Sequence, residues 1–574
     1  MQLNPEQIKS LITQERFEEA LNQIPPDNAL GRFDNLSFMS ILYFKSVCYL
    51  NLGELVKAKE MSTELLDLSQ KSQQILYGLD AICVLLKISM MLETRDETKT
   101  LLTQGESFIN QILDDGLIEY KYRKAAFLYL KATSIDPNTE SEFFSNLIQE
   151  SLSLREAIGD KMGMGESFFG LGNYHLYRGD RKLALKFFKK GLAIGEEIGS
   201  RYLISLVYRA LGNVFLFKGE FNLALDYTHK SLSLVESIKN KCEISHNLQH
   251  LGEIHYLKGE FDLAEKCTIR ALELAEATGY TVMVILCLYN LGRLLQDQGN
   301  FQASLEWYKK ALNLVKQRNA KFFLAEGLYN LIRLYTYHLI PKKAIPLLKE
   351  LEELKIEENT AWNNLMYNIG RALVLKTSKR LPDKMQALNI FQAIAKEPYS
   401  VYKITVDAII NLCDLLLYEL KMTGNEDLLG ELDHYCGQLL EISNKQSSYS
   451  LLAETYWLQS KLALLKLNIQ QAQSLLLKAQ SIAEEKGLKA LANSIGYDHF
   501  SFYSQLQKWE EYLDKNVSLI HRIDLAQLED FVIKLIYKEP NMVPQKTIEE
   551  LMKIEAFQEY LKDAKKILSE YDGE

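Results

Sequence analysis

Large side chains recur along the chain in two alternating helical patterns, most regularly over residues 161–355. In the first pattern they stand at i, i+3, i+6 and i+7, which places them on one face of a helix. The first copy of this pattern consists of Phe168, Leu171, Tyr174 and His175. The second pattern begins at an acidic residue or Asn, and its first copy consists of Leu183, Ala184, Phe187, Phe188 and Leu192. The alternation predicts pairs of amphipathic helices.

The two patterns together repeat every 40 residues. A Leu-Gly pair marks the first helix of each unit, at 171–172, 211–212, 251–252 and 291–292. A second glycine, which is expected to end that helix in a left-handed turn, follows at 179, 219, 259 and 299. The second helix has a small residue near its start, at Ala184, Ala224, Ala264, Ser304 and Ala344. Small residues are expected where two helices approach closely, so the pattern indicates an internal repeat of helix pairs.

These columns resemble the tetratricopeptide repeat (TPR) family. One copy reads Tyr208, Leu211, Gly212, Val214, Gly219, Ala224, Thr228 and Ser231. The unit departs from the family in being longer than the usual ~34 residues and in lacking the proline that usually closes the second helix. The longer form is similar to the repeats of LGN-type regulators, kinesin light chains, bacterial peptide-sensing regulators and archaeal TPR arrays. The resemblance implies an all-α fold, a right-handed TPR superhelical solenoid of antiparallel helix pairs.

Weaker copies flank the regular array. Gly53 and Ala58 match the glycine turn and the small column on the N-terminal side, and residues 456–479 contain a further copy. Prolines at 137 and 382 interrupt the pattern, and terminal repeats of a solenoid need a polar outer face. We therefore expect divergent N-terminal repeats at 1–160, the clear array at 161–355, divergent C-terminal repeats at 356–507 and a helical capping segment at 508–574.

On the first helices, the rows outside the core columns are rich in Asn, Gln, Arg, Tyr and His and contain no Lys. A side-chain amide can bond a peptide's C=O and N–H groups together, and Arg binds carboxylates through two parallel hydrogen bonds. The resemblance implies that these helices line a concave groove that holds an extended peptide with a ladder of Asn residues. The ladder here consists of Asn173, Asn213, Asn290 and Asn330, interrupted by His250 and Glu253.

The predicted groove residues are Asn173, Arg209, Asn213, His246, Gln249, His250, Glu253, Tyr289, Asn290, Arg293, Tyr329, Asn330 and Arg333. The three arginines predict a ligand with acidic side chains or a C-terminal carboxylate. An alternative interpretation is that these rows bridge adjacent repeats and that a partner binds elsewhere.

Composition and charge narrow the class of protein. The net charge of -9 argues against a nucleic-acid binder, which usually has a basic surface. The seven cysteines are odd in number and far apart, which favours free thiols in a reducing compartment over a disulfide framework. The sequence has no stretch of ~18 apolar residues that could cross a membrane and no signal-peptide pattern at its start. We therefore expect a cytoplasmic protein that contacts neither nucleic acid nor membrane.

Motifs that carry chemistry are missing from the sequence. It contains neither a G-x-x-x-x-G-K-[ST] phosphate loop nor an H-E-x-x-H metal motif. Cys242, His246 and His250 have a metal-like spacing, but on a helix the outer two lie about 12 Å apart, too far to share a zinc ion. No catalytic residue, metal or cofactor is expected.

The sequence thus predicts a non-enzymatic TPR scaffold or adaptor that binds a partner protein's peptide segment in its concave groove. Two alternatives stay open. One is a peptide-sensing signalling regulator, in which a ligand changes the curvature of the superhelix. The other is a structural protein that assembles with itself through an uncapped end.

Overall fold

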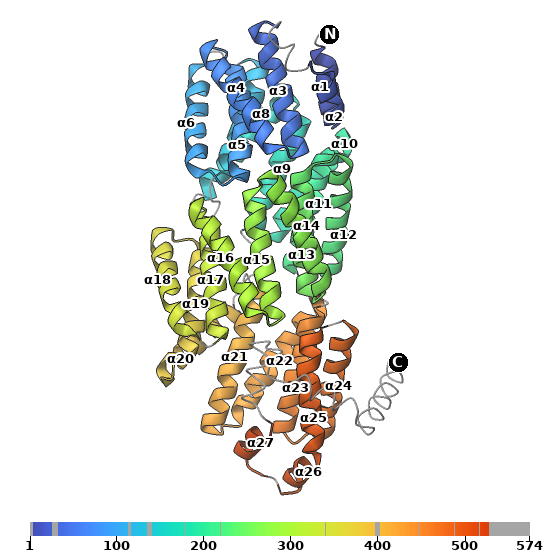
Figure 1. Cartoon of the computed structure of the whole chain (residues 1–574), viewed down its shortest axis with the longest axis vertical. Coiled ribbons are helices and arrows are strands. Elements are labelled where there is room, and N and C mark those ends of the chain that lie inside the picture. The colour runs from blue at the N-terminus through green and yellow to red at the C-terminus, as the bar shows by residue number, and fades with distance from the viewer. Residues whose placement is uncertain are drawn as a thin grey trace.

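The described part of the chain is an all-α solenoid. In the computed structural model these residues are 4–25, 33–112, 116–134, 141–177, 180–218, 220–338, 340–396, 402–446, 448–486, 488–515 and 517–526. They form 27 α-helices and no strand, and consecutive helices pack against each other along the long axis of the molecule (Figure 1). The predicted all-α solenoid of helix pairs is confirmed.

The described helices follow one another along the sequence and are named in an N-terminal, a central and a C-terminal group. The N-terminal group is α1 (Pro5–Thr13), α2 (Phe17–Gln23), α3 (Asn35–Leu52), α4 (Leu55–Lys71), α5 (Ile75–Met91), α6 (Arg95–Gln111), α7 (Ile118–Thr133) and α8 (Ser141–Ile158). The central group is α9 (Lys161–Tyr177), α10 (Arg181–Ile198), α11 (Arg201–Lys218), α12 (Phe221–Ser237), α13 (Lys241–Lys258), α14 (Phe261–Thr278), α15 (Thr281–Asp297), α16 (Phe301–Gln317), α17 (Lys321–Tyr337) and α18 (Pro341–Glu357). The C-terminal group is α19 (Ala361–Lys376), α20 (Leu381–Lys396), α21 (Tyr402–Thr423), α22 (Asp427–Gln446), α23 (Tyr449–Leu465), α24 (Ile469–Glu485), α25 (Lys489–Ser504), α26 (Leu506–Lys515) and α27 (Leu519–Leu525).

The central helices follow the 40-residue period. The first helices begin at residues 161, 201, 241, 281 and 321, and the second helices begin at 181, 221, 261, 301 and 341. Gly259 and Gly299, with φ of 83° and 77°, end α13 and the turn after α15 in the left-handed conformation, which glycine adopts without steric cost. Asn300 caps α16, because its side chain accepts a hydrogen bond from the backbone N–H of Ala303.

Some predicted features fall outside the described residues. These are the helix-ending glycines at 179 and 219, the break at Pro137, and residues 527–574 of the expected capping segment. The break at Pro382 is described. There α20 begins at Leu381, so the proline lies in the first turn of the helix, where the N–H that it lacks has no partner in the helix.

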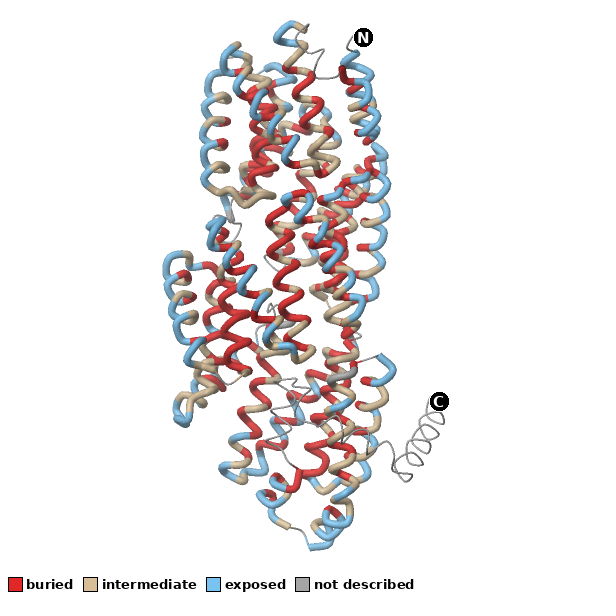
Figure 2. Tube along the Cα trace, in the orientation of Figure 1, coloured by how far each residue is buried: buried red, intermediate tan, exposed pale blue. Residues whose placement is uncertain are grey.

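The first helices form the inside of the solenoid and the second helices its outside. Buried residues run around α15 and α17, whereas α10, α12 and α18 have long exposed faces (Figure 2). A helix that is buried all round belongs to a core. α15 and α17 are therefore mostly enclosed by their neighbours instead of lining an open trough.

Successive turns of the superhelix touch each other directly. The Glu15 carboxylate follows α1 and accepts hydrogen bonds from Ser200 Oγ at 2.7 Å and from the backbone N–H of Tyr202 at 2.9 Å, at the start of α11. Further along, Ser448 Oγ donates to the backbone carbonyl of Leu257 at 2.8 Å. The partners are 185 to 191 residues apart in sequence. The solenoid is thus a stack of turns held together by polar contacts.

The Leu-Gly column marks a close approach between the helices of a pair, as predicted. A Cβ on Gly252 of α13 would overlap Thr268 Oγ1 of α14 and lie 3.2 Å from the backbone oxygen of Ala264. We expect Gly252→Leu to lower the free energy of unfolding by about 3 kcal/mol, because the backbone contact cannot yield. Gly430→Leu on α22 is the control, since nothing lies within 4 Å of its Cβ position. Equal melting curves for both variants would contradict this close approach.

Candidate functional site

All thirteen predicted groove residues lie on the inner helices α9, α11, α13, α15 and α17. The half-buried members are Asn173, Asn213, His246, Glu253 and Asn290. The buried members are Arg209, Gln249, His250, Tyr289, Arg293, Tyr329, Asn330 and Arg333. The structure brings them together along the inside of the coil, where most of them are shielded from solvent. That they bind a peptide stays a prediction.

The first two arginines connect neighbouring inner helices. Arg209 of α11 lies 3.3 Å from a carboxylate oxygen of Glu243 on α13 and donates to His246 Nε2 at 3.2 Å. Arg293 of α15 lies 3.6 Å from Glu253 on α13 and donates to the Asn290 side-chain oxygen at 2.6 Å. Both contacts agree with the alternative interpretation that these rows bridge adjacent repeats. The two arginines already have carboxylate partners within the chain.

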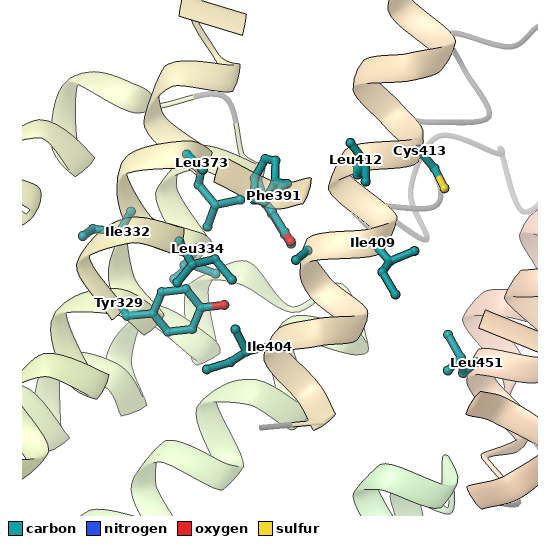
Figure 3. Close-up of a cluster of buried hydrophobic side chains, with 14 of the residues drawn as sticks. Tyr329, Ile332, Leu334, Leu373, Phe391, Ile404, Ile409, Leu412, Cys413 and Leu451 are labelled. Atoms are coloured by element: carbon teal, nitrogen blue, oxygen red, sulfur yellow. The ribbon is translucent and has the colours of Figure 1, made fainter. Parts of the chain in front are cut away.

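Arg333 of α17 is the centre of a larger buried network. Its guanidinium lies 3.2 Å from Asp407 of α21 and 3.8 Å from Asp297 of α15. Tyr329, one helical turn before it, donates its hydroxyl to the same Asp407 carboxylate at 3.1 Å, and in Figure 3 its ring points toward α21 beside Ile404. Burial opposes the charge on Arg333, but Asp407 and its neighbours outweigh burial and raise the pKa of the guanidinium well above its usual value. The network is held in its charged form.

Hydrogen bonds fix the tautomer of two histidines on α13. Thr228 Oγ1 donates to the Ala224 carbonyl at 2.7 Å, so it can only accept from His250 Nδ1, 3.1 Å away. His250 Nε2 is therefore an unprotonated acceptor, and it has no hydrogen-bond partner. His246 Nε2 is likewise an acceptor, because the Arg209 guanidinium can only donate. Burial lowers the pKa of His250 to about 4, and burial with the charge of Arg209 lowers the pKa of His246 well below 6.5.

Several buried side-chain amides on the inner helices have no hydrogen-bond partner. Asn330 of α17 is 1% exposed, and neither its side-chain nitrogen nor its side-chain oxygen forms a hydrogen bond within the described residues. The side-chain nitrogen of Asn290 and the side-chain oxygen of Asn247 are also unpaired. Buried polar groups are normally satisfied, and each unpaired one costs about 1–3 kcal/mol. Unpaired groups on three consecutive inner helices therefore mark a candidate binding surface.

Cys242, His246 and His250 do not converge on one point. The Cys242 thiol faces the backbone oxygen of Gly53 at 4.0 Å, whereas the two imidazoles contact Arg209 and Thr228. Within the described ranges, no group of three or more His, Cys, Asp or Glu residues is arranged to hold a metal ion. Nor does the part of the chain that the structure describes contain a helix long and apolar enough to cross a membrane.

The sequence of the central array matches a known family. The profile of the family described as tetratricopeptide repeat covers residues 243–317, which contain all but the first two residues of α13, the whole of α14–α16 and two of the Leu-Gly pairs. The chain is a TPR-type repeat protein. Its TPR units have the 40-residue length seen in the sequence, and the inner helices described above are the first helices of those units.

Comparisons with other proteins give only distant likenesses to this TPR protein. No curated protein matches it. A Rap protein solved in complex with competence and sporulation factor shares 13% identity and a TM-score of 0.44, covering 65% of this chain and 99% of that chain. Yeast Tom70 shares 14% identity and a TM-score of 0.36, covering 79% and 94%. A STAND protein with a TPR sensor from Pyrococcus horikoshii shares 14% identity and a TM-score of 0.38, covering 71% and 74%.

Proposed function

We propose that this TPR protein is a non-enzymatic adaptor that binds an extended segment of a partner protein on the inner face of α13, α15 and α17. The observation that carries the proposal is the set of buried, unpaired polar atoms on these helices. They comprise the Asn247 side-chain oxygen, His250 Nε2, the Asn290 side-chain nitrogen and both polar atoms of Asn330. An extended peptide offers an alternating series of C=O and N–H groups, which can satisfy both the donors and the acceptors in this set.

The partner segment is proposed to carry an acidic side chain or a C-terminal carboxylate. Such a group would take the place of Asp407 at Arg333 or of Glu253 at Arg293, since those carboxylates already pair with the arginines. The seven cysteines are all free thiols, which supports a reducing, cytoplasmic compartment. The acidic net charge supports a protein partner over a nucleic acid.

A second candidate function is a peptide-sensing regulator, and the enclosure of the inner face favours it. Unpaired atoms such as those of Asn330 are out of contact with solvent, so a ligand must part the stacked turns to reach them. Parting them breaks contacts such as the one between Glu15 and Ser200 and changes the curvature of the superhelix. Small-angle scattering with and without the bound segment separates the two functions. The turns of a regulator stay parted while the segment is bound, which changes the maximum dimension, whereas the turns of an adaptor close again over the segment.

Asn330→Leu is expected to raise stability and to abolish binding. Leucine has the same branched arrangement of four side-chain heavy atoms as asparagine, although its methyl groups are larger. It removes a buried amide that has no partner, so the free energy of unfolding rises by about 1 kcal/mol. The bound segment in turn loses the hydrogen bonds that it makes to this amide. Both effects are measured on one variant, by chemical denaturation and by titration with a segment identified from a partner pull-down.

The control is Asn313→Leu, on the exposed side of α16, which should change neither stability nor binding. If Asn330→Leu destabilises the protein, the amide has a structural partner and the proposed function loses its main support. If it stabilises the protein and leaves the segment's affinity unchanged, the segment binds on another surface.

A further inference from the structure

A second surface of interest lies where two turns of the superhelix meet. A hollow of about 580 Å³ lies between α4 on one side and Leu92, Thr278 and Gly279 on the other. Leu92 follows α5 in the first turn of the superhelix, whereas Thr278 ends α14 in a later turn. The volume is within the range of sites that take a small ligand or a few side chains.

The hollow has both apolar and acidic lining residues. The apolar ones are Leu55, Val56 and Leu92, of which Val56 is 68% exposed. Glu60, Glu64 and Asp67 line one rim at i, i+4 and i+7 of α4, a spacing that places them on one helix face. No hydrogen bond or ion pair joins these three carboxylates to any described residue.

The one cation among the lining residues does not neutralise this rim. Lys59 forms an ion pair with Glu97 of α6 at 2.8 Å, so its charge is already matched. Three adjacent carboxylates without counter-ions repel one another, and a cationic ligand would relieve that repulsion. An exposed aliphatic side chain in the same hollow favours an apolar group beside the cation.

We propose that this hollow is a docking site for a segment of a partner protein in which an aliphatic side chain stands between Lys or Arg residues. The aliphatic side chain lies on Leu55, Val56 and Leu92, and the basic side chains pair with Glu60, Glu64 and Asp67. The site is distinct from the inner face. Its occupant carries basic side chains, whereas the segment proposed for the inner face carries an acidic group that pairs with arginines. It does not depend on the function proposed above.

The hollow exists only while the two turns are stacked. Its far wall is the Thr278–Gly279 turn, and next to it Lys241 at the start of α13 pairs with Glu54 at 2.5 Å, just before α4. A segment in the hollow contacts both turns at once. Binding there therefore stabilises the closed stack, whereas a ligand on the inner face has to part the turns.

The test uses the full chain and three labelled synthetic peptides, followed by fluorescence anisotropy. One peptide has two Leu residues flanked by Lys, the second has the same Leu residues flanked by Glu, and the third has Lys flanking Ser. Only the Lys-Leu peptide is expected to bind, with an affinity that falls as salt is added. Binding of the Glu-Leu or Lys-Ser peptide with equal affinity would overturn the proposal, and so would the failure of all three to bind.

Charge reversal locates the site. Glu60→Lys combined with Glu64→Lys is expected to weaken the Lys-Leu peptide about tenfold, and Val56→Ser is expected to weaken it without changing its salt dependence. The matched control is Glu196→Lys combined with Glu273→Lys, which reverses the same charge on exposed faces of α10 and α14. Equal affinity in the rim and control variants would show that the peptide binds elsewhere. A dimer in sedimentation that the rim variant dissociates would assign the hollow to a second copy of this chain instead.

Discussion

Replacing Arg333 by Met is expected to lower the free energy of unfolding by about 3–5 kcal/mol. Arg333 is 5% exposed, and its guanidinium lies beside two carboxylates, those of Asp297 and Asp407. Methionine fills a similar space but leaves both carboxylates buried without their cation. Taking away one member of a buried ion pair costs far more than the pair itself contributes, because the remaining charge stays desolvated.

The loss should be local, because the stability of a solenoid is approximately a sum over repeats and the contacts between them. Hydrogen exchange in α15, α17 and α21 is therefore the measurement, alongside urea denaturation. Arg318→Met, at an exposed position after α16, is the control and should change neither. The double variant Arg333→Met with Asp407→Leu should recover part of the lost unfolding free energy, since it removes one of the two buried carboxylates left without a cation. Unchanged exchange in the single variant would show that the network is not coupled to folding.

Variants of the inner-face arginines change folding and partner binding together. Alanine at Arg209, Arg293 or Arg333 removes a contact between repeats, as the distances to Glu243, Glu253 and Asp407 show. A loss of partner affinity in such a variant follows from a weakened fold as readily as from a lost ligand contact. Asn330 separates the two effects, because removing its amide changes stability and binding in opposite directions.

The repeat could be predicted from the sequence because every unit has the same packing requirements at the same positions. The glycine of the Leu-Gly pair has to be small where α13 meets α14, at Gly252 and Thr268, and the same requirement returns every 40 residues. The helix ends could also be predicted from the sequence, since Gly259 is in the left-handed conformation expected of a glycine at a helix end. These contacts lie within one repeat unit or between neighbouring units. They recur in every unit, so the sequence periodicity predicts them.

The enclosure of the inner face could not be predicted in this way. It depends on how small rotations between successive repeats add up to a superhelix, and no single column of the repeat encodes that sum. Asp407 belongs to α21, outside the regular array, and nothing in the sequence places it beside Arg333. The contact of Glu15 with Ser200 spans 185 residues and has no sequence signature. The sequence does not point to Asn247 either, because this residue stands outside the rows of the first helices that supply the predicted groove residues.

Acid should destabilise the protein through His250, by about 3 kcal/mol between pH 6.5 and pH 4. In the folded protein burial lowers the pKa of His250 from 6.5 to about 4. The charge of Glu253 opposes this shift in the pKa, and the smaller effect of Arg209 acts in the same direction as burial. As the pH falls, His250 therefore takes up a proton near pH 6.5 in the unfolded chain but only near pH 4 in the folded chain. Stability from this residue is complete above pH 6.5 and is lost as the pH falls through that window.

The measurement is the difference in unfolding free energy between wild type and His250→Asn across the window, from urea denaturation at each pH. Asparagine suits the site, because Asn290 and Asn330 occupy the equivalent position in the next two repeats. A difference is needed because buried Asp80, whose pKa burial raises to about 6, acts in the opposite direction in both proteins. His434→Gln, at an exposed position of α22, is the control and should follow wild type.

His246 remains in both proteins, so a difference that stays flat from pH 7 to pH 4 would show that His250 accepts its proton without opening the contact with Thr228. A difference that grows as the pH falls would show that the inner face of α13 opens at the pH at which its imidazoles become charged.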